Sequence, residues 1–457
     1  MTVRVALESQ PFTPWKNRQG LWLLRMQGRL NIFQKSMLQW NDLHPYNAIH
    51  VVGIPGALEF ERLKGVITAT LEAKGLTGLS LDRSAGTFEY HGGAAATEIK
   101  LLPLETARTR TFGGEIERQL NTRFTSNERF SPFRFFVVPE QGSFSLGLVY
   151  FHAMADAECI LMLAKEIVDA YRNRTDADPT QAVERHPVRR DNLLLHHPGA
   201  LARKLVTLPP LIRTLRRSCR PNYRDAEDLS NQFGFFSLSP QTLSDLLRAA
   251  KSLSVTLNDL FLALLIKAVE LLTPDRTRER RRREISLGCI VNIRKDIGMT
   301  GGRAFGLFLG SFVVHHPVPA GTKLADLARD IGRQTLRIKK RRLYLGAGVE
   351  LAFGGLMSSL FSEPRRKRLY QKHYPLWGGL SNMDLNPLWP QPEEGQAVDY
   401  FRAVSTGPAT PLVLSITTIG RVANIGLTYR PTVFSAPEIE RIKDCFLDPR
   451  GFLAGNT

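Results

Sequence analysis

One histidine stands out by its spacing to an acidic residue. Of the ten histidines, only His152 has an aspartate four positions later, Asp156. At an Asp frequency of ~5%, ten histidines would give one such pair by chance roughly four times in ten, so spacing alone is a weak signal. An imidazole that reaches a cleft suits proton abstraction near neutral pH. The alternative is a hydrogen-bonded interior histidine with a structural role.

The elements around His152 decide where its ring can point. Residues 132–138 (PFRFFVV) and 143–151 (SFSLGLVYF) are rich in β-formers and predict a hairpin. Apolar residues then recur at helical spacing from Ile160 to Tyr171, which predicts a helix. His152 therefore leaves a strand end in a loop of small residues, from which an imidazole can project into a cleft.

The second half of the chain repeats this mixture of strands and helices. Its predicted elements are strands at 233–238 and 285–293, a capped helix at 256–272, a hairpin at 411–429 and a closing helix at 435–446. A polar, proline-interrupted stretch separates the halves. We therefore expect a mixed α/β protein with an N-terminal lobe at 1–175, an interlobe linker at 176–232 and a C-terminal lobe at 233–457.

Composition places the chain among ordinary globular proteins. It has 457 residues, 43% hydrophobic and 23% charged, with a formal net charge of +18. The four scattered cysteines do not form a disulfide framework, and neither a secretory signal nor a membrane-spanning stretch of ~20 apolar residues is visible. These features favour a cytoplasmic location.

Positive charge gathers in three runs, at 276–283, 339–342 and 365–368. Such runs are usually solvated faces, but they also raise the local concentration of an anionic partner. Nucleic acid is disfavoured, because neither zinc-finger spacing nor an aromatic RNA-binding signature is present. A membrane surface, a phosphate-bearing coenzyme and an acidic carrier protein stay open, and peripheral membrane contact is one of these alternatives.

Familiar catalytic signatures are absent: the sequence has no GxSxG, HExxH, GxxxxGK[ST] or GxGxxG. Metal-dependent hydrolysis and nucleotide hydrolysis are therefore disfavoured, and we expect no metal site.

The segment FHAMADA at 151–157 resembles the HHxxxDG motif of the coenzyme A-dependent acyltransferase superfamily. This superfamily includes chloramphenicol acetyltransferase, BAHD, alcohol and polyketide-associated acyltransferases, and nonribosomal condensation domains. Further segments are similar in the same order, namely TLNDLFLALLIKAV at 256–269, VNIRKD at 291–296, LSNMD at 380–384 and the hairpin at 411–435. Phe151 replaces the first His of the motif and Ala157 replaces its Gly. The family's base is the second His, so neither departure removes it.

The resemblance implies two chloramphenicol-acetyltransferase-like lobes in a pseudo-dimer with a tunnel between them. His152 would be the general base, and Asp156 would support the motif by pairing with Arg294 of the other lobe. Ser381 and Asn382 match the family's SN strand and are candidate oxyanion or tunnel residues, and an ordinary strand-end turn is the competing explanation. Trp377, Gly378 and Gly379, just before them, would line the tunnel or merely pack.

The resemblance further implies acyl transfer from a thioester to an alcohol or amine, in lipid or secondary metabolism. Acyl-CoA or a carrier-protein phosphopantetheine thioester would be the co-substrate, and no permanently bound cofactor is expected. Two other functions stay open: a catalytically silent, condensation-like module that binds an acidic carrier protein through its arginines, and a peripheral membrane or nucleic-acid binder. The acyl chain and the acceptor are not determined by the sequence.

Overall fold

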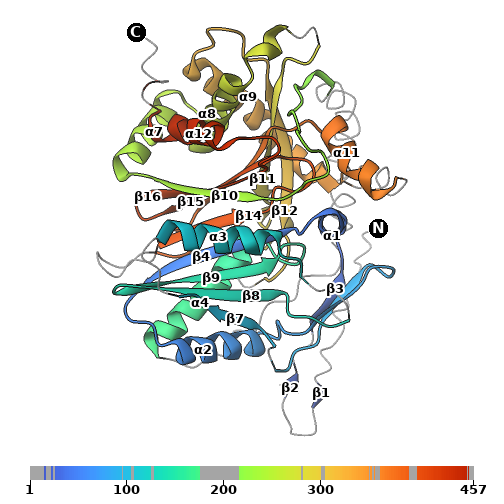
Figure 1. Cartoon of the computed structure of the whole chain (residues 1–457), viewed down its shortest axis with the longest axis vertical. Coiled ribbons are helices and arrows are strands. Elements are labelled where there is room, and N and C mark those ends of the chain that lie inside the picture. Colours follow the sequence, from blue (N-terminus) through green and yellow to red (C-terminus); the bar gives the residue numbers. More distant parts are fainter. Residues whose placement is uncertain are drawn as a thin grey trace, which may run out of the picture.

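The computed structural model describes residues 26–94, 96–103, 108–124, 128–174, 216–278, 281–299, 304–348, 361–390 and 399–449, with shorter pieces at 15–16, 22–23, 350–351, 355 and 451. Most of the predicted linker, up to residue 215, lies outside the described residues. Strands and helices together build two lobes stacked along the long axis of the molecule (Figure 1). The predicted mixed α/β class is confirmed.

The N-terminal lobe is built on a five-stranded sheet in the order β14-β4-β9-β8-β7. Its strands are β4 (Asn47–Pro55), β7 (Glu98–Leu101), β8 (Phe133–Glu140), β9 (Ser143–Phe151) and β14 (Asp399–Val404). Strands β8 and β9 form the predicted hairpin. Helices α2 (Phe60–Ala73) and α4 (Ala157–Asn173) cover the side away from the other lobe, while α1 (Ile32–Leu43) and α3 (Arg108–Asn121) lie toward it (Figure 1).

Smaller elements accompany this sheet. A three-stranded sheet in the order β3-β6-β5 joins β3 (Met26–Arg29), β6 (Thr87–Tyr90) and β5 (Leu79–Asp82), and β1 (Trp15–Lys16) pairs with β2 (Trp22–Leu23).

The C-terminal lobe is built on a six-stranded sheet in the order β10-β16-β15-β13-β11-β12. Its strands are β10 (Gln232–Leu238), β11 (Ile285–Asn292), β12 (Leu309–His316), β13 (Gly378–Asp384), β15 (Leu412–Ile419) and β16 (Val422–Tyr429). Its helices are α7 (Pro240–Ser252), α8 (Leu257–Leu272), α9 (Leu324–Lys340), α11 (Glu363–His373) and α12 (Ala436–Leu447), with short 3₁₀ turns η1 (Pro274–Arg278), η2 (Lys295–Ile297) and η3 (Leu343–Gly346). Helix α8 begins with the predicted capping box of Thr256 and Asp259.

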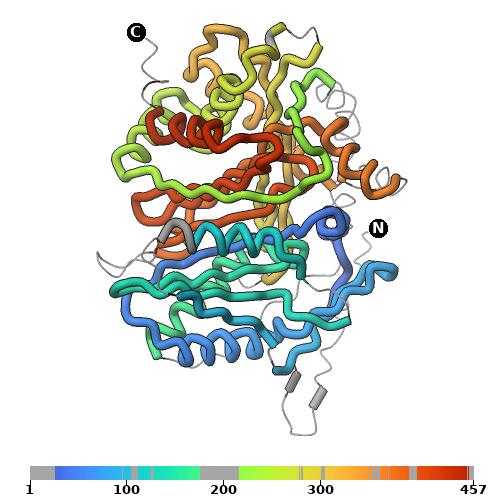
Figure 2. Tube along the Cα trace, in the orientation of Figure 1, coloured from blue at the N-terminus to red at the C-terminus, as the bar shows by residue number. Residues whose placement is uncertain are grey.

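Strand β14 crosses between the lobes. It comes from the second half of the chain, yet it pairs antiparallel with β4, with Arg402 opposite His50. It also lies against β15 and β16 of the other sheet. The tube in Figure 2 shows this orange segment between the two lobes. One strand thus joins both halves at the level where the lobes meet.

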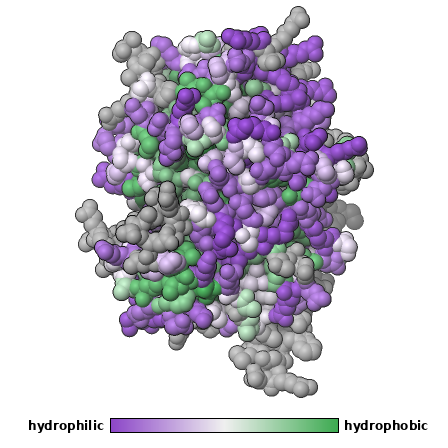
Figure 3. All heavy atoms as spheres, in the orientation of Figure 1, coloured by the Kyte–Doolittle hydropathy of each residue, from purple (hydrophilic) through white to green (hydrophobic). Residues whose placement is uncertain are grey.

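Buried apolar side chains form two large clusters, one in each lobe. Tyr400, Phe401 and Ala403 of β14 belong to the N-terminal cluster. The face of the molecule in Figure 3 is largely hydrophilic, as expected when many apolar residues are buried in two cores. No helix in the described part of the chain has the length and apolar character needed to cross a membrane.

Candidate functional site

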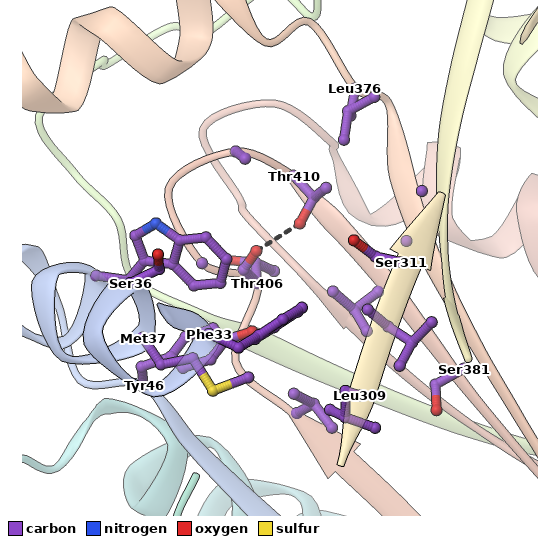
Figure 4. Close-up of a pocket in the computed structure, with 18 of the residues that line it drawn as sticks. Phe33, Ser36, Met37, Tyr46, Leu309, Ser311, Leu376, Ser381, Thr406 and Thr410 are labelled. Carbon is purple, nitrogen blue, oxygen red and sulfur yellow. Dashed lines mark hydrogen bonds between the residues drawn. The ribbon is translucent and has the colours of Figure 1, made fainter. Parts of the chain in front are cut away.

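A cavity of about 210 Å³ lies where the two lobes meet. Its lining includes residues from α1, α11, the end of β9, strands β11 to β15 and the segment after β14. Phe33, Met37 and Tyr46 lie on one side of it and Leu309 and Leu376 on the other (Figure 4). An apolar and aromatic lining with a few polar groups is typical of a small-molecule site.

His152 follows directly after β9 and lines this cavity. Its Nδ1 lies 3.1 Å from the carbonyl oxygen of Ala155. Because a carbonyl can only accept, Nδ1 carries the proton of the neutral ring and Nε2 carries the lone pair. The side chain is not sealed within packed hydrocarbon, and its lone pair is on the nitrogen that can act as a base.

Two tyrosines fix the plane of the imidazole. The Tyr46 ring stacks on His152 with centroids 5.4 Å apart, and Tyr150 meets it edge-on at 5.5 Å. Burial lowers the pKa of His152 below its ordinary 6.5, although the Ala155 carbonyl and the Asp156 charge oppose that shift. The ring is therefore held neutral and in one orientation near pH 7.

Asp156 is the N-cap of α4, and its Oδ1 accepts from the backbone N–H groups of Glu158 and Cys159. The same carboxylate accepts two hydrogen bonds from Arg294, at 2.8 and 2.9 Å. Phe308 N–H donates to it as well, at 2.8 Å. The Asp156 carboxylate thus connects the start of α4 to Arg294 and Phe308 of the second lobe.

Arg294 is also buried. Its guanidinium lies 4.3 Å from the centroid of the Phe308 ring. Burial opposes its charge, but the Asp156 carboxylate more than offsets this and raises the pKa of Arg294. The structure therefore brings the two predicted support residues together in a buried, bidentate pair; the supporting role itself stays a prediction.

Ser381 and Asn382 are separated by the alternation of strand β13. Ser381 lines the cavity, and its Oγ accepts a hydrogen bond from Arg402 at 3.2 Å. Asn382 is exposed and is not among the described lining residues. Successive side chains of a strand point to opposite faces, so of these two residues Ser381 is the one placed to meet a ligand in the cavity.

Trp377 and Gly379, which precede Ser381, also differ in whether they line the cavity. Gly379 lines the cavity, whereas Trp377 is buried against Phe434 and donates from Nε1 to the carbonyl oxygen of Cys219 at 3.1 Å. Of the two roles predicted for this segment, Trp377 therefore has the packing role. Gly379 has the other role, since it lines the cavity.

The two departures from the acyltransferase motif have local explanations. Phe151 points away from the cavity, since it packs against Phe124 and Phe130 in the N-terminal core. Ala157 is the first residue of α4, where helical backbone suits alanine and does not require glycine. Neither change disturbs the position of His152.

Sequence reasoning missed Arg402, Tyr46 and Tyr150, all of which line the cavity. Tyr150 lies two positions before His152, so strand alternation could have placed the two on one face. Arg402 enters from the unexpected strand β14, and no local signal marks it as buried.

No protein-family model matches this chain, and no curated protein matches its sequence. Solved structures match it over nearly its whole length. The condensation domain of the Monacolin K polyketide synthase MokA has a TM-score of 0.67 at 10% identity, covering 94% of this chain and 98% of its own. The first condensation domain of CDA synthetase has a TM-score of 0.64 at 12% identity, covering 94% and 97%. The starter condensation domain of rhizomide synthetase RzmA, as a variant bound to C8-CoA, has a TM-score of 0.65 at 14% identity, covering 94% and 95%. The chain therefore has the two-lobed fold of these condensation domains, which confirms the resemblance at the level of fold.

Proposed function

We propose that this protein transfers an acyl group from a thioester to an alcohol or amine, with His152 as the general base. The observation that carries the proposal is the hydrogen bond from His152 Nδ1 to Ala155 O at the wall of the interlobe cavity. It leaves a neutral imidazole with its lone pair on Nε2, which is the state that a base requires.

The reaction balances without a covalent enzyme intermediate. The acceptor oxygen or nitrogen gives its proton to His152 and attacks the thioester carbonyl carbon, whose π electrons move to the carbonyl oxygen. When the tetrahedral adduct collapses, the carbonyl re-forms, the C–S bond breaks, and His152 returns the proton to the sulfur. His152 therefore ends the cycle neutral.

The lining supports an acyl donor. Phe33, Met37 and Phe312 give the cavity apolar walls suited to a hydrocarbon chain. A structural neighbour, RzmA, was solved with C8-CoA. We propose a CoA or carrier-protein thioester as co-substrate, with no permanently bound cofactor.

Basic residues near the cavity support an anionic donor. Tyr370 of α11 lines the cavity, while Arg365, Arg368 and Lys372 of the same helix are exposed. Phosphates of coenzyme A or of phosphopantetheine, and an acidic carrier protein, would be attracted to this helix.

Thiol release from a panel of acyl-CoA thioesters, with short alcohols and amines as acceptors, tests the proposal. His152→Ala should lower the rate ~10²- to 10⁴-fold while the protein stays folded. His91→Ala, a histidine bonded to Ser80 outside the cavity, is the matched control and should keep full activity. A folded His152→Ala protein with undiminished transfer would discard the mechanism.

A catalytically silent module that binds an acidic carrier protein is the second candidate, favoured by the exposed cations of α11 and by Phe151 in place of the first motif histidine. In that case no thioester is consumed by the wild-type protein, and His152→Ala leaves carrier affinity unchanged. Measuring binding and turnover on the same carrier separates the two functions.

A further inference from the structure

Arg402 is a buried cation without a carboxylate partner among the described residues. It is 1% exposed, and burial lowers its pKa, a shift that the phenol groups of Tyr150 and Tyr400 oppose. All its hydrogen-bond acceptors are neutral: Thr417 Oγ1, Ser381 Oγ, Ser381 O and Ile416 O. A buried charge without a counter-charge is costly. A buried arginine at a cavity therefore indicates that an anionic ligand binds there.

Sheet register places Arg402 on the same face as the proposed base. Arg402 lies opposite His50 on β4, and Tyr150 of β9 lies opposite Ala48, two positions along β4. Positions two apart along a strand share a face, so Arg402, His50, Tyr150 and His152 all come from one face of the N-terminal sheet. The cavity lies against this face, since Arg402, Tyr150 and His152 all line it.

The donors of Arg402 are incompletely used. Nε donates to Thr417 Oγ1 at 2.9 Å, and Nη2 donates to two carbonyl oxygens. Nη1 makes one hydrogen bond within the described structure, to Ser381 Oγ at 3.2 Å, although it carries two hydrogens. Because Ser381 Oγ accepts that bond, its own hydrogen can be donated to a ligand. Figure 4 shows Ser381 across the cavity from Phe33, Met37 and Tyr46.

A second group at the cavity also has an unused polar atom. The Tyr150 hydroxyl is buried and has no hydrogen-bond partner in the described part of the molecule, although Tyr150 lines the cavity. Its side chain is 1% exposed. A buried phenol without a partner is expensive and indicates that a ligand or water completes the site.

We propose that Arg402 and Ser381 form an anion site inside the cavity, which receives a negatively charged oxygen of the reacting substrates. Two sources share this chemistry: the oxyanion of the tetrahedral adduct, and the carboxylate of a carboxylate-bearing acceptor. Arg402 supplies charge and a free N–H, and Ser381 supplies an O–H oriented by Arg402. This inference rests on the proposed function, because that function places the acyl chain in this cavity.

Calorimetric titration with octanoate tests the site without turnover, and octanamide is its neutral counterpart. Octanoate should bind ~10- to 100-fold more tightly than octanamide, and the preference should vanish in Arg402→Gln and weaken in Ser381→Ala. The control is Arg430→Gln: Arg430 is equally buried, at 1%, with neutral acceptors Thr406 and Gly407, but does not line the cavity. If Arg402→Gln fails to fold, the weaker preference for octanoate in Ser381→Ala still tests the site.

Equal affinity for octanoate and octanamide in the wild type, or a preference that persists in folded Arg402→Gln, overturns the proposal. Octanoate binding that depends on Arg402 in a protein that transfers no acyl group refutes the proposed function and keeps the anion site. The two failures are therefore distinguishable.

Kinetics separates the two sources. If the site holds the oxyanion, Arg402→Gln lowers kcat ~10²- to 10³-fold for neutral and carboxylate-bearing acceptors alike. If it holds an acceptor carboxylate, the substitution raises KM for acceptors with a carboxylate and leaves neutral acceptors unchanged. An unchanged kcat and KM for both acceptor classes counts against either form of the site.

Discussion

His152 is prepared as a base by contacts that act on different properties of its ring. The Ala155 carbonyl fixes the tautomer, Tyr46 and Tyr150 fix the orientation, and burial lowers the pKa. Without these contacts the ring would for part of the time have its proton on Nε2, turn out of position, or carry a positive charge. The local sequence supplies the Ala155 carbonyl and Tyr150, whereas Tyr46 reaches the ring from a distant segment.

The pH dependence of turnover follows from the sign of the His152 shift. The neutral ring is the active form, and burial lowers its pKa below the ordinary 6.5. We expect kcat/KM to rise with pH through a midpoint that lies below pH 6.5. A pH profile of kcat/KM measures this, and an acid limb with its midpoint above pH 6.5 would contradict the assignment.

The Asp156–Arg294 pair should matter for stability more than for proton transfer. Both side chains are buried, at 1% and 6% exposed, so removing one leaves the other charge without its partner. Asp156→Asn or Arg294→Met should each cost ~3 to 5 kcal/mol of unfolding free energy. Urea unfolding measures the loss.

The control for that measurement is Glu440→Gln, which breaks an exposed pair with Lys443 and should cost less than ~1 kcal/mol. If Asp156→Asn and Glu440→Gln lose similar stability, the buried pair does not hold the lobes together.

Around the cavity, the sequence could predict His152, Asp156 and Arg294 because they belong to recognisable short segments. Arg402 could not be predicted, since a buried arginine and an exposed one have the same sequence signature. Its position depends on the pairing of β14 with β4, strands about 350 residues apart in the chain.

Local elements were predictable where a periodic pattern or a cap defines them. The β8–β9 hairpin, α8 with its Thr256 cap and the closing hairpin of β15 and β16 all appear as expected. Strand β14 was missed because its sequence, DYFRAV, lacks simple alternation and carries an arginine in its middle. Its side chains are buried by both lobes at once, which a single-sheet pattern does not describe.

The contact between β14 and β16 can be tested at one glycine. A Cβ added at Gly426 of β16 would lie 1.9 Å from the carbonyl oxygen of Arg402, and backbone cannot move aside cheaply. Gly426→Ala should therefore destabilise the protein by ~1 to 3 kcal/mol or more through overpacking. Thermal unfolding reports the change.

Gly234 of β10 provides the matched control, because it lies in the same sheet with its nearest obstacle 3.9 Å away. Gly234→Ala should keep the wild-type Tm within a few degrees. If Gly426→Ala is equally stable, the two sheets are not in close contact at β14.

At the scale of the whole molecule, the basic runs differ in whether their side chains are buried or exposed. Arg276, at the start of one basic run, is buried and donates to the carbonyl oxygens of Arg283 and Val318, so it is structural. The run on α11 is different, because Arg365 and Arg368 are exposed on a helix whose Tyr370 reaches the cavity. Of these two runs, α11 is the one placed to attract a donor.

Reversal of a single charge on α11 should slow capture of an anionic donor and leave the chemical step unchanged. Arg365→Glu should lower kcat/KM for acyl-CoA ~3- to 10-fold at low ionic strength, with kcat unaltered. Added salt should shrink the difference, because the Debye length falls to ~8 Å at 0.15 M. Arg441→Glu on α12 makes the same change in net charge at an exposed position outside the cavity lining. Equal losses in both variants would mean that net charge, and not the position of α11, attracts the donor.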